Sequence, residues 1–295
     1  MHLRLLAGAI LALGLILPGA RAAQAVRDIP HSEWNAPQKP FRIYGNTWYV
    51  GPYGLSSVLV DTGQGLALFD GGLPESATQI EAHIRALGFR VRDVKWILNS
   101  HAHSDHAGGI AALRAASGAQ VLASAAGAHE LELGGADPGD PQYGSAPQYK
   151  PVKQVRVVRD GEVLQLGRVA ITAHYTPGHT PGSTSWTWDA CEGGRCLHMA
   201  YADSLSAIAA PGYRFIDHPA YVAAFRKGLA TVAALPCDIL VTPHPDASGF
   251  WEKVAQRKSP TDVAPLVDSQ ACRNYAAGAA KNLDAQLAKE RAGAK

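Results

Sequence analysis

The sequence predicts a mixed α/β (or α+β) fold in which two similar halves pack sheet on sheet. Short apolar segments with β-branched residues recur along the chain, most of them separated by glycine-containing turns. Helical patterns follow each group of strands, so that the order strands then helices occurs twice. The 295 residues, of which 47% are hydrophobic and 18% charged, suffice for one large domain with a substantial core.

The first half alternates strands with helical segments. A helix is predicted over residues 75–87, with Ile80, Ile84 and Leu87 on one face and Gly88 at its end. A second helix is predicted over residues 110–116. The expected strands span residues 41–44, 47–50, 56–61, 66–70, 94–100 and 120–123.

The second half repeats this pattern after a long loop. Residues 134–151, rich in Gly, Pro, Tyr and Gln, are interpreted as an active-site flap or a disordered surface insertion. A helix is predicted over residues 219–234, and a mostly helical tail over residues 261–290, with Thr261 or Asp262 as its cap. The expected strands span residues 155–158, 162–164, 169–175, 183–188, 197–201 and 238–242.

Residues 1–22 are predicted to be a secretory signal peptide, and residues 23–295 a single domain. A short basic start precedes an uncharged, largely apolar run over residues 5–17, and small residues follow. They offer a cleavage site after Ala22, with Ala25 as a second candidate. The alternative is an uncleaved anchor, for which the apolar run is short. We therefore expect a periplasmic protein without membrane attachment after cleavage.

The net charge of the mature chain bears on two classes of partner. Cleavage after Ala22 removes Arg4 and Arg21, which leaves 27 − 2 = 25 basic residues against 25 acidic ones. A formal net charge of zero gives no reason to expect nucleic acid or an anionic membrane surface as a partner. We expect a monomer that acts on a small molecule.

Four cysteines in an exported chain predict disulfides, and three pairings are possible. The most economical pairing joins Cys191 to Cys196 across a polar hairpin tip and leaves Cys237 for Cys272. The alternative is that a cysteine binds zinc, although neither pair has the CxxC spacing of zinc sites.

The segment 101–106, which reads HAHSDH, holds four residues that can bind a metal. It follows an apolar strand and precedes a helix, the kind of loop that carries active sites in open α/β sheets. In an extended segment, His101, His103 and Asp105 share one side, and a bend brings His106 close. Imidazole and carboxylate are ligands of zinc. The alternative is a polar loop whose histidines only form hydrogen bonds.

Two further histidines occupy the same kind of position, just past a strand. His179 lies in the tight loop TPGHTPGS, and His244 stands between Pro243 and Pro245. Proline stiffens the backbone and so presents a ligand at a fixed geometry. Either histidine alone could be a structural loop residue, but together with the 101–106 segment they predict a metal site.

HxHxDH, a later PGHTPG and a histidine at a C-terminal strand end resemble the signature of the metallo-β-lactamase superfamily. The resemblance covers nearly the whole mature chain, and it is greatest for class B β-lactamases of subclass B3. It implies a four-layer αββα sandwich with metals at one edge, between the two halves.

The resemblance also implies a set of site residues. His101, His103 and His179 match a three-histidine zinc site, and Asp105, His106 and His244 match a second zinc site. Histidine rather than asparagine at position 101 disfavours the one-metal subclass, and residues 201–206 offer no cysteine ligand, which favours B3. Ser204 and Ser206 would hold the substrate carboxylate, with Tyr213 close by; an ordinary polar loop is the alternative for these three.

The implied activity is hydrolysis of the amide bond of β-lactam antibiotics (penicillins, cephalosporins and carbapenems), and hence antibiotic resistance. A hydroxide shared by two Zn²⁺ ions would attack the carbonyl carbon. The three-histidine metal would polarise the carbonyl, and Asp105 would orient the hydroxide. A serine mechanism would need Ser-x-x-Lys, which the chain lacks.

Two other functions remain open. In a di-metal thioester or lactone hydrolase, like glyoxalase II or the acyl-homoserine lactonases, Asp203 would bridge the two metals. A zinc-sequestering export protein would bind metal tightly and hydrolyse nothing.

Overall fold

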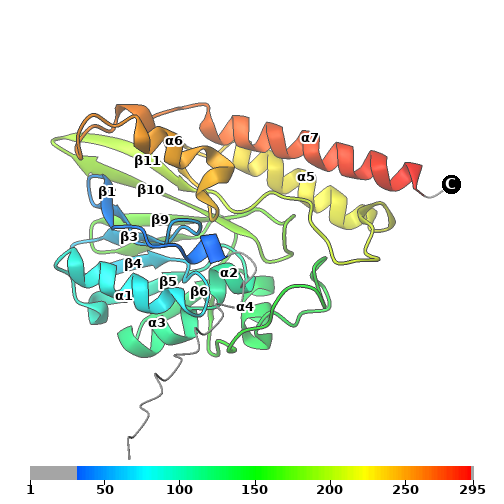
Figure 1. Ribbon diagram of the computed structural model, residues 1–295, viewed down its shortest axis with the longest axis horizontal. Coiled ribbons are helices and arrows are strands. Elements are labelled where there is room, and N and C mark those ends of the chain that lie inside the picture. The colour runs from blue at the N-terminus through cyan, green and yellow to red at the C-terminus, as the bar shows by residue number, and fades with distance from the viewer. Residues whose placement is uncertain (1–31, 294–295) are drawn as a thin grey trace, which may run out of the picture. The chain divides into compact units, whose positions relative to one another are not determined.

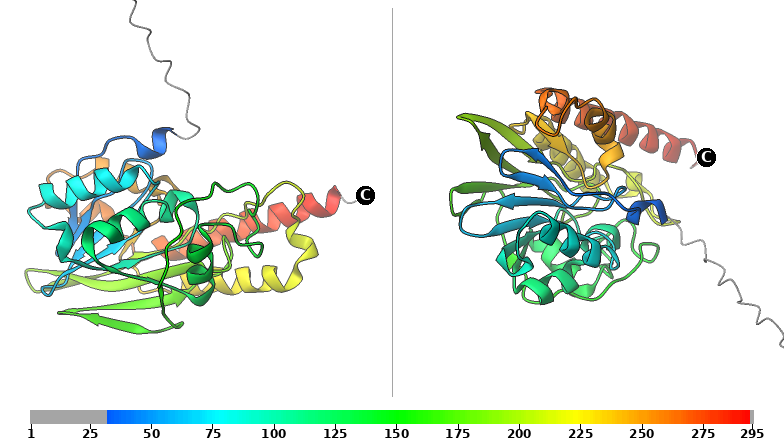
Figure 2. Two further views of the ribbon diagram at one scale, coloured as in Figure 1. Left: turned by 90° about the horizontal axis from the view of Figure 1, so that it is seen from below. Right: turned by 60° about the vertical axis from the view of Figure 1, so that its left-hand side comes forward.

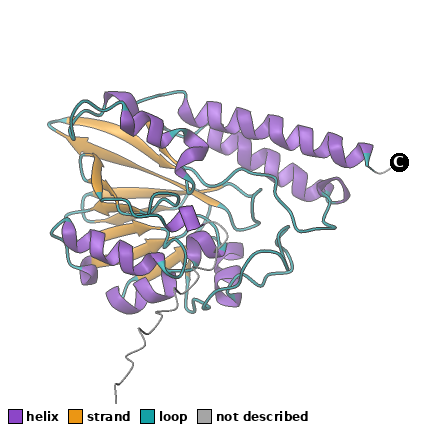
Figure 3. Ribbon diagram, viewed as in Figure 1, coloured by secondary structure: helices purple, strands orange, loops and turns teal. Residues whose placement is uncertain are grey.

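Two mixed β-sheets lie face to face between two layers of helices (Figures 1 and 3). The computed structural model describes residues 32–293, and those from Glu33 onward form one compact unit. The predicted two-sheet sandwich is therefore confirmed. The predicted signal peptide and its cleavage sites lie outside the described residues. Among the described residues, no helix is long and apolar enough to cross a membrane.

The first sheet has seven strands in the order β1-β2-β3-β4-β5-β6-β7. β1 to β4 pair antiparallel, and β4 to β7 pair parallel. All four residues of β4 are buried, as expected for a strand covered on both faces. The bounds are β1 Phe41–Tyr44, β2 Thr47–Tyr49, β3 Val58–Asp61, β4 Leu66–Phe69, β5 Val94–Leu98, β6 Gln120–Ala123 and β7 Arg156–Val157.

The second sheet has five strands in the order β12-β11-β10-β9-β8. β8 to β11 pair antiparallel, whereas β12 runs parallel to β11. The bounds are β8 Val163–Leu166, β9 Val169–Tyr175, β10 Thr184–Glu192, β11 Arg195–Tyr201 and β12 Ile239–Val241.

Helices cover the outer face of each sheet (Figure 2). α1, α3 and α4 pack on the first sheet, and α5 and α7 pack together on the second. In α1, Ile80 and Ile84 are buried one turn apart, and Gly88 (φ 86°) follows the helix, as predicted. The bounds are α1 Ser76–Ala86, α2 Ser104–Ala107, α3 Ile110–Ser117, α4 Ala125–Leu133, α5 Pro219–Ala233, α6 Phe250–Ala255 and α7 Ala271–Ala292.

The main core lies between the two sheets, where the inner faces of both contribute large side chains. Phe69 of β4 stacks on Trp188 of β10, with ring centroids 4.6 Å apart. Trp186 donates from Nε1 to the carbonyl oxygen of Asn99 at 3.1 Å, which ties the second sheet to the end of β5. The apposed sheets thus fix the loops at their ends relative to each other.

The predicted strands and helices are found with small shifts at their ends, but the C-terminal helix begins later than expected. α7 starts at Ala271, and Asp262 does not cap it. Instead, the Asp262 carboxylate accepts hydrogen bonds from the amides of Lys258 and Ala264 in a turn. The short helices α4 and α6 were not predicted; in α4, Gly127 and several alanines leave only a weak apolar pattern.

Both predicted disulfides are formed. Cys191–Cys196 joins directly paired residues of β10 and β11, and Cys237–Cys272 ties the start of β12 to the second residue of α7. Since no cysteine is free, the alternative of a cysteine zinc ligand is wrong.

The two disulfides should contribute unequally to stability. Loop-closure entropy predicts a loss of about 4 kcal/mol when Cys237 and Cys272 are both replaced by alanine, because they close a loop with a sequence separation of 35. The matched double variant at Cys191 and Cys196, with a separation of 5, should lose about 2 kcal/mol. Urea unfolding measures both values. Equal losses would contradict the loop-length explanation.

Candidate metal centre

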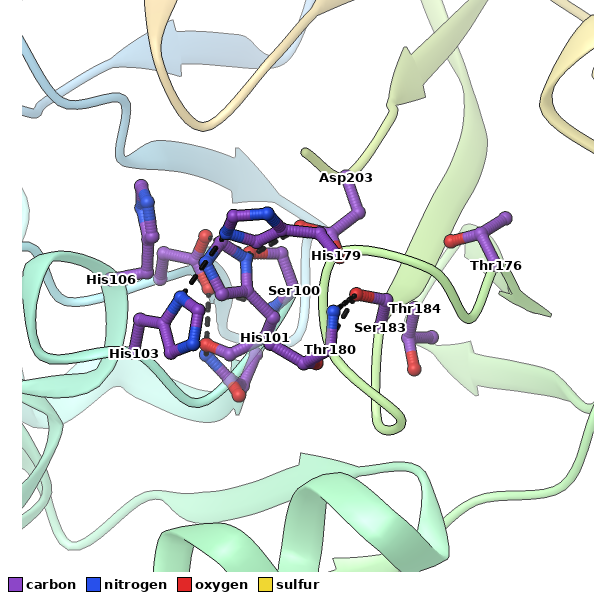
Figure 4. Close-up of polar contacts among 12 residues, drawn as sticks. Ser100, His101, His103, His106, Thr176, His179, Thr180, Ser183, Thr184 and Asp203 are labelled. Atoms are coloured by element: carbon purple, nitrogen blue, oxygen red, sulfur yellow. Dashed lines mark hydrogen bonds and ion pairs between the residues drawn. The ribbon is translucent and has the colours of Figure 1, made fainter. Parts of the chain in front are cut away.

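The candidate centre is built from loops that follow four strands: β5, β9, β11 and β12. The segment with His101 follows β5, His179 follows β9, Asp203 follows β11 and His244 follows β12. Figure 4 shows His101, His103, His106 and His179 with their side chains gathered in one place. The structure thus brings together residues that are far apart in the sequence.

His101, His103 and His179 form a buried cluster. Their potential ligand atoms lie within 4.8 Å of one another. Nδ1 of His103 faces Nε2 of His179 at 3.1 Å (Figure 4). This is the grouping that the resemblance implied for the three-histidine site.

Asp105, His106 and His244 form a second cluster beside the first. Oδ2 of Asp105 lies 3.1 Å from Nε2 of His106 and 3.1 Å from Nε2 of His244. The two nitrogens are 3.2 Å apart. All six predicted ligands are therefore present in two adjoining groups.

The expectation of an extended 101–106 segment is wrong for its second part. His103 has extended backbone dihedrals (φ −75°, ψ 154°), but Ser104–Ala107 form the helical turn α2. Asp105 and His106 consequently turn toward His244, while their potential ligand atoms still lie within 4.8 Å of that of His101.

Each imidazole of the first cluster has a polar partner behind it. Nδ1 of His101 lies 2.7 Å from Oδ1 of Asp203. Nε2 of His103 lies 2.7 Å from Oδ2 of Asp140. Nδ1 of His179 lies 2.9 Å from the carbonyl oxygen of Ser206. Because carboxylate and carbonyl oxygens only accept, the outer ring nitrogens must donate.

These contacts test whether a metal fits. A neutral imidazole has one N–H, so the inner nitrogens of His101, His103 and His179 carry lone pairs. Two of these lone pairs face each other at 3.1 Å, and the third, on Nε2 of His101, is buried without a hydrogen-bond partner among the described residues. Convergent buried lone pairs suit a cation, and a nitrogen and oxygen donor set is one that zinc accepts.

Burial and charge shift the titration of the cluster in the metal-free protein. Burial, and then the charges of neighbouring histidines, hold the pKa of His101 and of His179 well below the usual value. Burial alone would raise the pKa of Asp105, but the His106 charge and the hydrogen bonds from His106 and His244 hold it well below its usual value. Asp105 is therefore ionised at neutral pH.

Asp70 holds the start of the HAHSDH segment through hydrogen bonds. Its carboxylate accepts hydrogen bonds from Asn99 Nδ2 (3.0 Å), from the backbone and hydroxyl of Ser100 (2.8 and 2.6 Å) and from the Tyr201 hydroxyl (2.9 Å). Desolvation raises its pKa to about 6. Its positive φ of 56°, unusual for a residue with a side chain, is held by these four bonds. The network links β4, the end of β5 and β11.

The loop that carries His179 is fixed by close packing. A Cβ atom on Gly178 would come within 2.1 Å of the Phe225 ring of α5, so that only glycine fits there. The Tyr221 hydroxyl of the same helix donates to the Gly178 carbonyl at 3.0 Å. α5 therefore sets the position of His179.

The predicted substrate residues differ in their surroundings. Ser204 and Ser206 line a cavity of about 460 Å³, together with His244 and with Asn274 and Asn282 of α7. Ser206 also contacts His179, because its Oγ lies 3.0 Å from Nδ1. Tyr213 is not among the residues that line this cavity, and its ring stacks on His218 at 4.4 Å.

Asp203 has the geometry of an orienting carboxylate. It meets the nitrogen of His101 that points away from the other imidazoles. A carboxylate that bridges two metals would face the inner nitrogens instead. The contact thus resembles the carboxylate–histidine–zinc arrangement.

Sequence reasoning missed Asp140 and Glu130, which lie behind His103. Both are buried, and their potential ligand atoms lie within 4.8 Å of each other and of His103. Burial raises the pKa of Asp140, but its hydrogen bond to His103 and the charge of His103 lower it to about 2. Burial, and then the Asp140 charge, raise the pKa of Glu130 well above its usual value. No spacing signal in the sequence connects Asp140 to a histidine 37 residues earlier.

The family profile and the similar solved structures indicate the same family. The profile of the metallo-beta-lactamase superfamily matches residues 50–193. The solved structure of MEM-A1, a subclass B3 metallo-beta-lactamase from a soil metagenome library, is 52% identical with a TM-score of 0.85, and the match covers 88% of this chain and 99% of that one. MIM-1 from Novosphingobium pentaromativorans is 47% identical with a TM-score of 0.84, over 89% and 94% of the two chains.

A more distant relationship is to a hydroxyacylglutathione hydrolase. The hydroxyacylglutathione hydrolase of Anaeromyxobacter dehalogenans is 37% identical over 131 residues. These residues make up 44% of this chain and only 41% of that protein. The shared region is therefore less than half of either molecule.

In the metal-free protein, the lowered pKa values predict a loss of stability as the pH falls from 7 to 5. Folded His101 and His179 resist protonation, whereas the unfolded chain binds protons near pH 6.5, so acid favours the unfolded state. Each such proton changes the unfolding free energy by about 1.4 kcal/mol per pH unit.

His179→Asn should therefore flatten this pH dependence by up to about 1.4 kcal/mol per pH unit, measured by urea unfolding with a chelator present. His106, whose raised pKa acts in the opposite sense, is retained in both proteins. His129→Asn, which removes an exposed histidine of α4, is the matched control. An unaltered slope in His179→Asn would contradict the prediction.

Proposed function

The chain belongs to the metallo-β-lactamase superfamily, and we propose that it hydrolyses the amide bond of β-lactams at a two-zinc centre. The observation that carries this proposal is the convergence of six potential ligands in two adjoining groups, the first of them buried. The similarity to subclass B3 metallo-β-lactamases over nearly the whole described chain supports the substrate class.

We assign His101, His103 and His179 to one zinc ion, and Asp105, His106 and His244 to the other. Bound zinc would supply Lewis acidity, which lowers the pKa of a coordinated water toward about 7 and stabilises negative charge on a carbonyl oxygen. The loops of both sheets hold the two groups side by side, so that one substrate can reach both.

The protein's own groups bind and orient the reactants. Hydrolysis adds the oxygen of water to the lactam carbonyl carbon, breaks the C–N bond and delivers a proton to the nitrogen. Ionised Asp105 can accept a hydrogen bond from the attacking water and so orient it. The hydroxyl of Ser204, at the cavity wall, can donate to the substrate carboxylate. The Ser206 hydroxyl can also donate to the substrate carboxylate, but its oxygen is at the same time in contact with Nδ1 of His179.

The cavity beside His244 suits a small molecule. Its volume of about 460 Å³ falls within the range of small-ligand sites. The serine hydroxyls and asparagine amides in its largely apolar lining suit a carboxylate-bearing substrate. Tyr213, whose ring stacks on His218, has a weaker claim to a role in binding.

A thioester or lactone hydrolase is the second candidate, favoured by the similarity to hydroxyacylglutathione hydrolase. The contact of Asp203 argues against it, because Oδ1 of this carboxylate is occupied by the outer nitrogen of His101. The β-lactam assignment is therefore preferred.

Export to the periplasm, action as a monomer and a contribution to antibiotic resistance belong to the same proposal. The two disulfides are typical of proteins that fold in an oxidising compartment.

Protein loaded with zinc should open a chromogenic cephalosporin and a carbapenem, and a chelator should abolish both activities. A lactone and a glutathione thioester in the same panel test the second candidate. Turnover of the thioester or the lactone alone would replace the β-lactam assignment. Failure on every substrate with two zinc ions bound would support a metal-sequestering protein instead.

Asp105→Ala should lose one of the two zinc ions and lower kcat/KM for a cephalosporin by at least about 100-fold, because it removes a ligand and an orienting carboxylate together. Metal analysis and steady-state kinetics measure the two effects. Asp189→Ala, which removes a surface carboxylate paired with His198, is the control. Full zinc content with full activity in Asp105→Ala would refute the assigned role.

A further inference from the structure

A pair of buried carboxyl groups lies behind His103, on the side away from the other candidate ligands. Asp140 belongs to the irregular loop 134–151, and Glu130 to α4. Their exposed fractions are only 3% and 1%. A buried carboxylate is costly unless polar partners satisfy it, so the contacts of this pair need an explanation.

Asp140 is held at both of its carboxylate oxygens. Oδ2 lies 2.7 Å from Nε2 of His103, and Oδ1 accepts a hydrogen bond from the backbone N–H of Gln142 at 2.6 Å. The side chain therefore has one fixed orientation. Neither carboxylate oxygen of Glu130 has a geometric hydrogen-bond partner among the described residues, and one of them lies within 4.8 Å of the Asp140 carboxylate.

The contact decides which nitrogen of His103 faces the metal centre. An imidazole that donates from Nε2 keeps its lone pair on Nδ1. Nδ1 is the atom that faces His179, at 3.1 Å. Without Asp140, rotation of the ring about χ2 would exchange the nitrogen and carbon atoms at this position, and either tautomer could form.

The loop that carries Asp140 is hydrogen-bonded both to the HAHSDH segment and to the loop that follows β11. The Tyr149 hydroxyl donates at 2.7 Å to the carbonyl of Ala102, the residue between His101 and His103. The Ala210 N–H donates at 2.8 Å to the carbonyl of Pro141, next to Asp140. The base of the loop is closed by one hydrogen bond, from the Tyr149 N–H to the Gly134 carbonyl at 3.0 Å. Hydrogen bonds thus attach residues 134–151 to the segment that carries His103 and to the loop after β11, contacts that a disordered insertion would lack.

We propose that Asp140 is a positioning residue that fixes the His103 imidazole with Nδ1 toward the metal, and that loop 134–151 exists in part to hold this carboxylate in place. The inference rests on the proposed metal centre but not on the identity of the substrate. The second cluster, Asp105, His106 and His244, has no contact with Asp140 in the hydrogen bonds and ion pairs of the described residues.

The test compares Asp140→Ala and Asp140→Asn with the wild type and with Asp137→Asn. Asp137 is the matched control, because its carboxylate lies in the same loop and accepts only from the Gly139 amide there. Competition with a chromophoric chelator measures the affinity of each of the two zinc sites. NMR correlation of the ¹⁵N-labelled histidine rings in metal-free protein identifies the nitrogen of His103 that carries hydrogen.

We expect Asp140→Ala to weaken zinc binding at the three-histidine site by about 10- to 100-fold, with the other site retained. The His103 ring should change from the Nε2–H form to a mixture of tautomers. Asp140→Asn, whose single oxygen can serve either His103 or Gln142, should lie between alanine and the wild type, and Asp137→Asn should behave as the wild type.

Wild-type zinc affinity and an unchanged tautomer in folded Asp140→Ala would overturn the proposal. A third bound zinc that is lost in both Asp140→Ala and Glu130→Gln would also overturn it, because Asp140 would then be a metal ligand. If Asp140→Ala does not fold, Asp140→Asn serves as the test. Wild-type zinc affinity and an unchanged His103 tautomer in Asp140→Asn would then overturn the proposal. Site-selective loss of zinc in a protein that opens no β-lactam would uphold the positioning role and refute only the substrate.

Discussion

The histidines of the candidate centre depend on hydrogen-bond acceptors placed behind them. Buried imidazoles could satisfy their polar atoms by bonding to each other, and a metal would then have no free lone pairs to bind. Asp203, Asp140 and the Ser206 carbonyl prevent this, since each takes the N–H of one ring. The remaining lone pairs point inward, where a cation would stabilise them. Metal binding and the stability of the surrounding loops are therefore linked.

The sandwich supplies these acceptors from distant parts of the chain. The HAHSDH segment follows a strand of the first sheet, whereas Asp203 follows β11 of the second. Their contact requires the two sheets to be held in a fixed relation, which the aromatic core between them provides. The Asp70 network, with donors from the end of β5 and from Tyr201 of β11, adds a polar link at the same edge.

Local pattern was enough to predict the strands, most of the helices and the side chains that gather at the centre. HAHSDH carries its signal in six residues, and the tight loops around His179 and His244 follow apolar strands. The structure brings these residues together, and their role as ligands stays a prediction. The helical turn at Asp105 was missed because a four-residue helix has no periodicity to detect.

Asp140 could not be predicted for a different reason: its contact with His103 is a tertiary one, made by an irregular loop. The start of the C-terminal helix was misplaced because Asp262, a good helix cap by residue type, instead stabilises a turn.

The two-metal centre is tested most directly by anomalous diffraction at the zinc edge from crystals of active protein. Two adjoining peaks are predicted, one among His101, His103 and His179 and one among Asp105, His106 and His244. An active protein with no anomalous peak at these side chains would contradict the assignment of the centre.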